Sequence, residues 1–424
     1  MIETTKFKQL KIKYMKKLLL TACLFSAAMS VQAQQALWGG ASIKSPEVNA
    51  DNTVTFRYQD PKAVKVQITG DFLPEATIEV PNFGKMATAG TADLVEKDGV
   101  WEFTTPQPLE SNYYTYTFVV DGVKTTDPAN VYINRDVATI TNYFIIKKDA
   151  GDKGDLYSVN NVKHGTVRKM WYHSDVIGTD RRVTVYTPAG YETSGKKYPV
   201  FYLLHGAGGD EEAWYTQGRT TQILDNLIAS GQAEPMIVVM TNGNAWQTAA
   251  PGESTEGYKQ PSMGGSSRVQ TKEAAFELHF PEVVSFIEKN FRTYKDKGHR
   301  AIAGLSMGSF HSENISKYYP TMFGYVGLFS GASVGGSLSN NQQYTTDVYT
   351  DFDGKMATQF SAKNRPSLYM ICCGKTDFVK QGVDQLREYM TQHNYPFEYV
   401  ETEGGHIWRN WRYYLSIFAP RLFK

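Results

Sequence analysis

The sequence predicts an α/β domain with a mostly parallel sheet, preceded by a small all-β sandwich domain. The chain has 424 residues, which favours two domains over one. From about Ser45 to Ile146 it consists of short strand-like runs and turns, and beyond Asp155 strand-like runs alternate with helical ones. The segment between them, Lys147 to Asp155, is charged and carries glycines, so we interpret it as the linker.

The first region has the pattern of a β-sandwich of about a hundred residues. Its strand-like runs alternate polar and apolar residues or are rich in aromatic ones: TVTFRYQDP, AVKVQITGDF, GVWEFTTP, NYYTYTFVVDG and TITNYFII. The dipeptides Asp98-Gly99 and Asp121-Gly122 are typical of tight hairpin turns. The region contains no long helical period, so we expect strands throughout.

In the second region, strand-like runs alternate with runs that have the period of an amphipathic helix. The predicted strands are RRVTVYTP, YPVFYLLHG, MIVVMTNG, HRAIAGLS, YVGLFSGA, SLYMICCG and PFEYVETEG. The predicted helices are TTQILDNLIASG, FELHFPEVVSFIEKNF, VDQLREYMTQHN and IWRNWRYYLSIFAPRLF. Such alternation implies right-handed crossovers and a mostly parallel sheet. Residues 333–366 show little period, and we expect them to form an insertion over the top of the sheet, where a lid would sit.

The composition argues against several partners. The chain has 44 basic and 43 acidic side chains, a formal net charge of +1, so nothing favours nucleic acid or an anionic membrane. No set of Cys and His residues has the spacing of a zinc site, and we expect neither a metal nor an organic cofactor. Cys372 and Cys373 are adjacent on a predicted strand and would point to opposite faces, so we expect two buried thiols rather than a disulfide.

The N-terminus, residues 1–33, reads as a secretory signal peptide. Starting at Met15, two lysines precede an apolar stretch that ends at a small-residue cleavage site, Val31-Gln32-Ala33. The stretch is too short and wrongly flanked for a membrane span. This predicts a secreted or periplasmic protein that starts at Met1 or Met15, and the alternative is a lipoprotein anchored through Cys23.

A serine between two glycines stands where a predicted strand meets a predicted helix. Gly304-Leu305-Ser306-Met307-Gly308 fits the pattern G-x-S-x-G, in which a strained turn presents a nucleophilic serine above the sheet. The alternative is a plain tight turn. The strand-to-helix context favours the nucleophile.

A serine needs a base to activate it and an acid to orient the base, which in this architecture follow in the order Ser, Asp or Glu, His. Beyond the serine helix only two histidines are far enough along the chain, and we choose His406, in a glycine-rich loop, over His393, at the end of a helix. For the acid we choose Asp377, which follows a strand, since active-site residues of open parallel sheets lie at the carboxyl ends of strands. The competitors are Glu401, Glu403 and Asp384.

The run Leu203-Leu204-His205-Gly206-Ala207-Gly208-Gly209 follows an earlier strand. We expect the backbone N–H groups of Gly206 and Ala207, with that of Met307, to form an oxyanion hole. The alternative is an ordinary glycine turn.

These motifs together resemble the esterase D family of α/β-hydrolases, and within it the bacterial feruloyl and acetylxylan esterases of carbohydrate esterase family 1. The resemblance rests on LLHGAGGDEEAW, FPEVVSFIEKNFRT, RAIAGLSMGS, CGKTDF and GGHIW, and covers roughly residues 155–424. The first region, with GDFLP, GVWEFTTP, YTFVVDGV and DPAN, resembles the immunoglobulin-like early-set domain grouped with glycogen-binding-type carbohydrate modules. One departure is Ser309, where a second glycine is common. The implied domains are 34–150 and 151–424.

The resemblance implies a triad of Ser306, Asp377 and His406 in a secreted serine esterase. We expect it to remove feruloyl or related hydroxycinnamoyl groups from plant cell-wall xylan or arabinoxylan. The alternatives are an acetylxylan esterase and a catalytically silent carbohydrate-binding protein on the same fold.

Several aromatic side chains are candidates for substrate contacts. Trp214, Trp246 and Trp408 could shape the acyl pocket, where a planar ring would stack well on them, or they belong to the core. In the first domain Trp101, Tyr113 and Tyr114 form either a sugar platform or the sandwich core.

Overall fold

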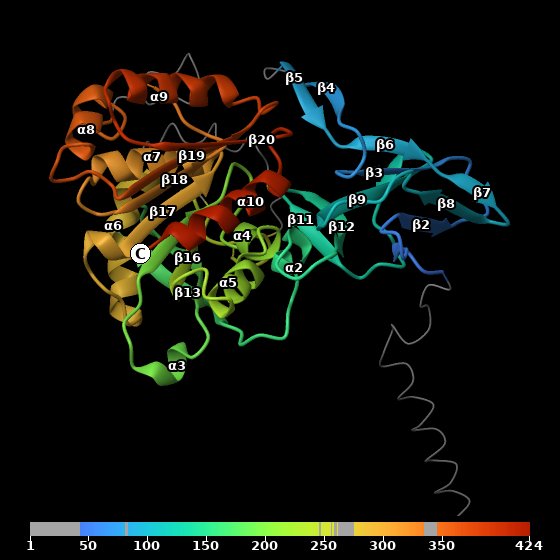
Figure 1. Ribbon diagram of the computed structural model, residues 1–424, viewed down its shortest axis with the longest axis horizontal. Coiled ribbons are helices and arrows are strands. Elements are labelled where there is room, and N and C mark those ends of the chain that lie inside the picture. Colours follow the sequence, from blue (N-terminus) through green and yellow to red (C-terminus); the bar gives the residue numbers. More distant parts are fainter. Residues whose placement is uncertain are drawn as a thin grey trace, which may run out of the picture.

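The computed structural model describes residues 43–80, 84–245, 247–255, 257, 261, 275–334 and 346–424. It shows an N-terminal all-β region beside a C-terminal α/β domain (Figure 1). The predicted signal peptide, Cys23 and Trp246 lie outside the described residues. Within the described part, every helix is too short or too polar to cross a membrane.

The N-terminal region consists of two sheets and a separate hairpin. One sheet has the order β1-β2-β8-β7, and the other has the order β11-β12-β9-β3-β6 with β10 paired to β9. Strands β4 and β5 form the hairpin. The bounds are β1 Glu47–Val48, β2 Val54–Gln59, β3 Val66–Gly70, β4 Ala76–Val80, β5 Gly84–Thr88, β6 Gly90–Asp93, β7 Val95–Lys97, β8 Val100–Thr104, β9 Asn112–Val120, β10 Val123–Thr125, β11 Ile133–Asp136 and β12 Thr139–Ile146.

Both predicted Asp-Gly turns close hairpins. Asp98 and Gly99 have φ of 53° and 80° between β7 and β8, and Asp121 and Gly122 have φ of 49° and 86° between β9 and β10. Two consecutive residues with positive φ match the right-handed twist of the paired strands, which is why Asp-Gly is favoured there. The side chains that the two sheets bury form an aromatic-rich core that includes Phe56, Tyr114, Phe118 and Phe144.

The C-terminal domain is built on an eight-stranded sheet of order β13-β14-β16-β15-β17-β18-β19-β20. Strands β15 to β20 are mutually parallel, while β13 and β14 are antiparallel to their neighbours. The bounds are β13 Thr166–Ser174, β14 Thr179–Thr187, β15 Val200–Leu204, β16 Ile237–Thr241, β17 Arg300–Leu305, β18 Tyr325–Phe329, β19 Leu368–Gly374 and β20 Glu398–Thr402. The prediction of a mostly parallel sheet is therefore confirmed.

Helices cover both faces of this sheet (Figure 1). Helices α6, α8 and α9 pack into the core on one face, and α5 and α10 into the core on the other. The bounds are α2 Lys153–Tyr157, α3 Tyr191–Ser194, α4 Ala213–Thr216, α5 Thr220–Ala229, α6 Ala275–Asn290, α7 Met307–Tyr318, α8 Phe352–Gln359, α9 Lys380–Gln392 and α10 Trp408–Phe418. Cys372 belongs to one core and Cys373 to the other, both as free thiols, as alternation along β19 predicts.

The sequence missed several elements, among them β13, α2 and α8. The edge strand β13 fully buries only Tyr172 and Ser174, so it has no continuous apolar run. Helix α2 lies at the end of the segment interpreted as a linker. Helix α8 lies within residues 333–366, where no helix was expected, and it places Phe352 and Met356 in the core beneath the sheet. Residues 335–345 of that segment lie outside the described part.

The two domains share a buried contact. Tyr113 of β9 is fully buried and belongs to the same core as Trp411 and Tyr414 of α10. The guanidinium of Arg412, also buried, lies 4.3 Å from the centre of the Tyr113 ring and donates to the carbonyl oxygens of Gln217 and Tyr113. The N-terminal region therefore contributes a side chain to the interior of the α/β domain.

Candidate active site

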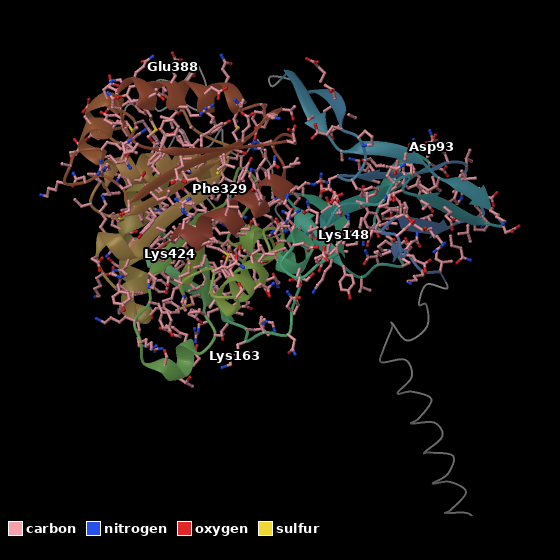
Figure 2. All side chains as sticks on the ribbon, in the orientation of Figure 1. Asp93, Lys148, Lys163, Phe329, Glu388 and Lys424 are labelled. Carbon is pink, nitrogen blue, oxygen red and sulfur yellow. The ribbon has the colours of Figure 1, made fainter. Side chains whose placement is uncertain are left out.

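The serine of the G-x-S-x-G motif occupies a strained turn between β17 and α7. Ser306 has φ of 51° and ψ of −117°, a backbone conformation that residues other than glycine rarely adopt. Its N–H donates to the carbonyl oxygen of Phe329 at 2.9 Å, at the end of the neighbouring strand β18. Phe329 is labelled in the interior of the α/β domain (Figure 2). Such strain persists only where the surroundings enforce it, and it is common at functional sites.

Both glycines of the motif are required by close backbone approach. A Cβ atom at Gly304 would lie 2.3 Å from the carbonyl oxygen of Gly308, and one at Gly308 would lie 2.4 Å from that of His205. Any side chain at either position would force β17, α7 and the loop after β15 apart. The glycines therefore hold these three elements together around Ser306.

Ser309, which departs from the family pattern, has a partner behind the turn. Its hydroxyl is fully buried and donates to the carbonyl oxygen of Gly331. A Cβ atom at Gly331 would in turn lie 2.6 Å from the carbonyl oxygen of Ser306. The hydroxyl of Ser309 thus ties the first turn of α7 to the segment after β18. A glycine at this position would leave the carbonyl oxygen of Gly331 without this donor.

The predicted base and acid form a hydrogen-bonded pair. His406 lies in the loop between β20 and α10, and its Nδ1 is 2.9 Å from Oδ1 of Asp377, in the loop after β19. The Asp377 side chain is fully buried, and the same oxygen accepts the N–H of Val379 at 3.1 Å. A carboxylate on Nδ1 fixes the imidazole tautomer so that Nε2 is left to act as the base. Like Ser306, both residues follow the carboxyl ends of parallel strands.

Two aromatic rings that the sequence did not single out contact the imidazole. The ring of Phe378 lies 4.4 Å from that of His406, and the ring of Trp411 lies 4.9 Å away at nearly a right angle. Trp411 is buried, whereas Phe378 remains 37% exposed. Phe378 directly follows the acid in CGKTDF, which is the one signal that would have identified it.

The predicted oxyanion loop lies directly against the serine. A Cβ atom at Gly206 would come within 3.0 Å of the Ser306 Cβ atom and 2.6 Å of Leu305 Cδ1. The structure thus brings Gly206 and Ser306 together, with Ala207 next in the loop and Met307 at the first position of α7. A helix N-terminus and an adjacent loop are the usual sources of backbone donors for an oxyanion.

A buried histidine holds this loop in place. Nε2 of His205 accepts the N–H of Gly243 at 2.8 Å, so the ring proton is on Nδ1, which lies 2.6 Å from the carbonyl oxygen of Gly206. Full burial lowers the pKa of His205 to about 4, because the charged imidazolium would lose its hydration. His205 is therefore neutral near pH 7 and links the oxyanion loop to the loop after β16.

A buried carboxyl group lies beneath the same loop. Glu211 accepts from the side chain of Asn242 at 3.0 Å and from the N–H of Ala250 at 2.9 Å. Burial raises the pKa of Glu211 to about 7. These contacts join the end of the oxyanion loop to the segment after β16, which Arg181 also binds through four carbonyl oxygens.

The structure places two of the three candidate tryptophans. Trp214 is only 1% exposed, and its indole N–H donates to the carbonyl oxygen of Leu204 at 2.8 Å. Trp408 is partly buried, and its ring packs against those of Trp214 and Trp411. Trp214 therefore supports the end of β15 from within the core, whereas Trp408 packs against that core and keeps part of its surface exposed.

The aromatic candidates of the first domain lie in or against the cores. Tyr113 and Tyr114 are buried in cores, and the indole N–H of Trp101 donates to the carbonyl oxygen of Asp60. Among the described residues, no group of three or more His, Cys, Asp and Glu side chains could hold a metal ion.

The chain is similar to known esterases. Residues 174–421 match the protein family described as putative esterase. Over 385 residues the chain is 29% identical to an endo-1,4-beta-xylanase/feruloyl esterase of Xylanibacter ruminicola, a match that covers 89% of this chain and 46% of that protein. An esterase of Mycobacterium tuberculosis is 27% identical over 57% of this chain and 56% of its own length. The chain spans about half the length of these curated relatives.

Solved structures agree with this relationship. The CE1 ferulic acid esterase of the anaerobic fungus Anaeromyces mucronatus is 26% identical, with a TM-score of 0.52 over 63% of this chain and 93% of that one. The enterobactin esterase of Shigella flexneri, at 16% identity, shares the fold over 92% of this chain and 98% of its own, with a TM-score of 0.60. The expected α/β-hydrolase with a preceding all-β domain is thereby confirmed. Because the family match spans more than half of the chain, this protein belongs to the putative esterase family.

Proposed function

We propose that this protein is a serine esterase that removes hydroxycinnamoyl groups, feruloyl in particular, from plant cell-wall xylan or arabinoxylan. The observation that carries the proposal is the pair formed by His406 and Asp377, 2.9 Å apart, at the same edge of the sheet as the strained Ser306. The names of the xylanase/feruloyl esterase and the ferulic acid esterase to which the chain is similar support the substrate class.

In the proposed reaction Ser306 Oγ attacks the ester carbonyl while Nε2 of His406 takes the hydroxyl proton. The negative charge on the carbonyl oxygen is stabilised by the N–H groups of Gly206, Ala207 and Met307. The tetrahedral intermediate collapses, the imidazolium protonates the departing sugar oxygen so that the sugar leaves as an alcohol, and an acyl-enzyme remains. Water, deprotonated by the same imidazole, then releases the acid and restores the serine. Asp377 stabilises the imidazolium in both halves.

The acyl group is proposed from the aromatic surroundings of the base. The ring of Phe378 is 37% exposed beside the imidazole, so a planar hydroxycinnamoyl ring could stack on it as it does on other aromatic rings. Trp214 is left out of the proposed acyl contacts because it is buried in the core, whereas the partly exposed Trp408 stays a candidate. No cofactor takes part in the proposed chemistry.

The location and the domain limits also belong to the proposal. We propose a signal peptide at residues 1–33, an early-set domain at 34–150 and a hydrolase domain at 151–424, in a secreted or periplasmic protein. Lipid attachment at Cys23 is the alternative. The last strand of the first domain ends at Ile146 and α2 begins at Lys153, which supports the boundary.

The experiment compares Ser306→Ala with Ser316→Ala, a control on the helix that follows Ser306, whose hydroxyl is buried and donates to the carbonyl oxygen of Glu313. Ser306→Ala is expected to lower kcat on methyl ferulate by about 10⁴-fold or more and to abolish labelling by a fluorophosphonate, while Ser316→Ala keeps both. Hydrolysis of methyl ferulate by Ser306→Ala at the parental rate would refute the assignment.

The choice of substrate separates the alternatives. Turnover of acetylated xylan without turnover of methyl ferulate would indicate an acetylxylan esterase. A folded parent protein that the fluorophosphonate fails to label would indicate the silent carbohydrate-binding protein.

A further inference from the structure

A turn of the N-terminal domain rests on the oxyanion loop. Residues 135–137, at the end of β11 and the start of the turn to β12, reach the loop that follows β15, and β11 lies beside α4 in the ribbon view (Figure 1). Gly208 has φ of 76°, and a Cβ atom there would lie 2.8 Å from Cγ1 of Val137. The valine side chain therefore occupies the space beside the Gly208 backbone.

Polar contacts fix the same turn to the same loop. Nη2 of Arg135 donates to Oδ2 of Asp210 at 2.6 Å, and the Asp210 side chain is only 1% exposed. Oδ1 of Asp210 accepts the N–H of Glu212, so the carboxylate that binds Arg135 is also bonded to the backbone of the loop. Asp136 accepts from the side chain of Gln217 at 3.2 Å.

The turn itself is held in an unfavourable conformation. Val137 has φ of 53°, which is sterically disfavoured for a β-branched residue. Nη1 of Arg135 donates to the carbonyl oxygen of Val137 at 3.1 Å, so the arginine that binds Asp210 also braces the turn. Strain of this kind is retained where the surrounding structure enforces it, and it clusters at functional sites.

The domains are also joined at a second place. Tyr113 and Arg412 already join the two domains through a buried ring and buried hydrogen bonds. The turn adds contacts to a loop whose backbone lies against Ser306. A displacement of backbone donors by an ångström is enough to weaken their interaction with a developing oxyanion.

We propose that Arg135 and Val137 are positioning residues that hold the oxyanion loop in its active geometry. The N-terminal domain is then a working part of the hydrolase site and acts through Gly208 and Asp210 on the donors of Gly206 and Ala207. The proposal rests on the proposed function, because it assigns the loop to oxyanion stabilisation.

The experiment measures steady-state hydrolysis of methyl ferulate by the full chain carrying Arg135→Met, which keeps the aliphatic stem and removes the donors. A second variant, Val137→Ala, removes the packing on Gly208. Both are expected to lower kcat about ten-fold with KM within two-fold of the parent, since the donors act on the transition state rather than on the bound ester. The affinity for a phenylboronic acid, which forms a tetrahedral adduct with the serine, is expected to fall by the same factor.

Three controls distinguish positioning from loss of fold. Arg135→Lys, which restores a donor, is expected to recover kcat to within about three-fold of the parent. Arg57→Met removes a comparable arginine, bound to Glu47 and Glu102 in the same domain but distant from the hydrolase, and is expected to leave kcat unchanged. Thermal unfolding confirms that each variant is folded.

The outcomes separate the two proposals. Folded Arg135→Met with parental kcat, a rise in KM alone, or an equal loss of kcat in Arg57→Met would each overturn the positioning role. Ser306→Ala is assayed alongside: if it stays active, the proposed function and the role given to the loop both fail. If it is inactive while Arg135→Met is fully active, only the positioning role fails.

Discussion

The two loops predicted to carry the oxyanion donors and the base are held in different ways. The oxyanion loop is mostly buried, and it is bound by the His205 ring on one side, by Asn244 on another and by the N-terminal domain on a third. The loop that carries His406 is partly exposed. It is bound by Asn410, whose amide donates to the carbonyl oxygens of Glu403 and Gly405, and by the N–H of Thr376, which donates to the carbonyl oxygen of Gly404.

This difference corresponds to what each loop does in the proposed reaction. Backbone donors for an oxyanion act by being fixed before the charge develops, so every additional contact helps. The imidazole must take a proton from the serine and later give it to the sugar oxygen. A loop that allows the ring small movements fits this role. Variants on the two loops should therefore fail in different ways.

The largest expected effect comes from the partner of the histidine. Asp377→Asn preserves the shape of the side chain but favours the wrong tautomer of His406, and we expect kcat to fall by about 10³- to 10⁴-fold. Asp384→Asn serves as the control, because that carboxylate is paired with Lys380 and Arg387 on α9. Activity of Asp377→Asn within ten-fold of the parent would contradict the assignment of the acid.

The next effect tests how rigid the oxyanion loop is. Gly206→Ala places a methyl group against Leu305 and Ser306, and because the loop is bound on three sides it cannot yield without losing its donors. We expect kcat to fall by about 10²- to 10³-fold with KM little changed. In the control Gly298→Ala, the new Cβ would approach only the flexible side chain of Asp296. Parental kcat in Gly206→Ala would show that the loop is not fixed.

The buried His205 should make stability depend on pH. Its pKa is about 4 in the folded protein, below the value of about 6.5 in an unfolded chain, so the unfolded chain binds the proton first. The free energy of unfolding therefore falls as the pH decreases from about 6.5 to about 4, by up to about 3 kcal/mol. The measurement is urea unfolding at several pH values for the parent and for His205→Asn.

The difference between those two proteins isolates the histidine. Burial raises the pKa of Glu211 to about 7, so this group contributes the opposite trend, its stabilisation being lost as the pH rises through that value. Glu211 is present in both proteins, so its contribution largely cancels when the two free energies of unfolding are subtracted. A difference that stays constant from pH 7 to pH 4 would show that His205 is not buried in its neutral form.

The smallest effect concerns the histidine loop. Asn410→Ala removes both amide hydrogen bonds to that loop, and we expect kcat to fall about ten-fold because His406 is less often in position. Asn290→Ala is the control, since that amide binds only the carbonyl oxygen of Phe286 at the exposed end of α6. A loss as large as that of Gly206→Ala would mean that the two loops are equally rigid.

Much of this arrangement could be predicted because it is local in sequence. The G-x-S-x-G motif, the glycine-rich run after β15 and the order of acid and base identified the segments that the structure gathers at one edge of the sheet. The hydrogen bond between His406 and Asp377 agrees with the expected pair, although their roles in catalysis remain a proposal. The Asp-Gly turns were predictable because their backbone conformation is set by two adjacent residues.

The remainder depends on contacts between distant segments. Nothing in the composition of α10 says that Trp411 rather than Trp408 lies against His406, because the choice depends on how the helix is rotated on the sheet. The contact of Val137 with Gly208 joins two domains across about seventy residues of sequence, and no periodicity encodes it. Helix α8 was missed because its apolar residues are few and its core contacts come from α7 and the sheet.

The burial of Tyr113 in the hydrolase interior has a practical consequence for anyone who dissects this protein. A clone that begins at residue 151 would lack the ring on which the Arg412 guanidinium lies, and it would expose an unsupported cation and an apolar surface to water. Grafting another binding module in front of residue 151 would leave the same defect. Engineered fusions should therefore keep the N-terminal region and the α/β domain together as one unit.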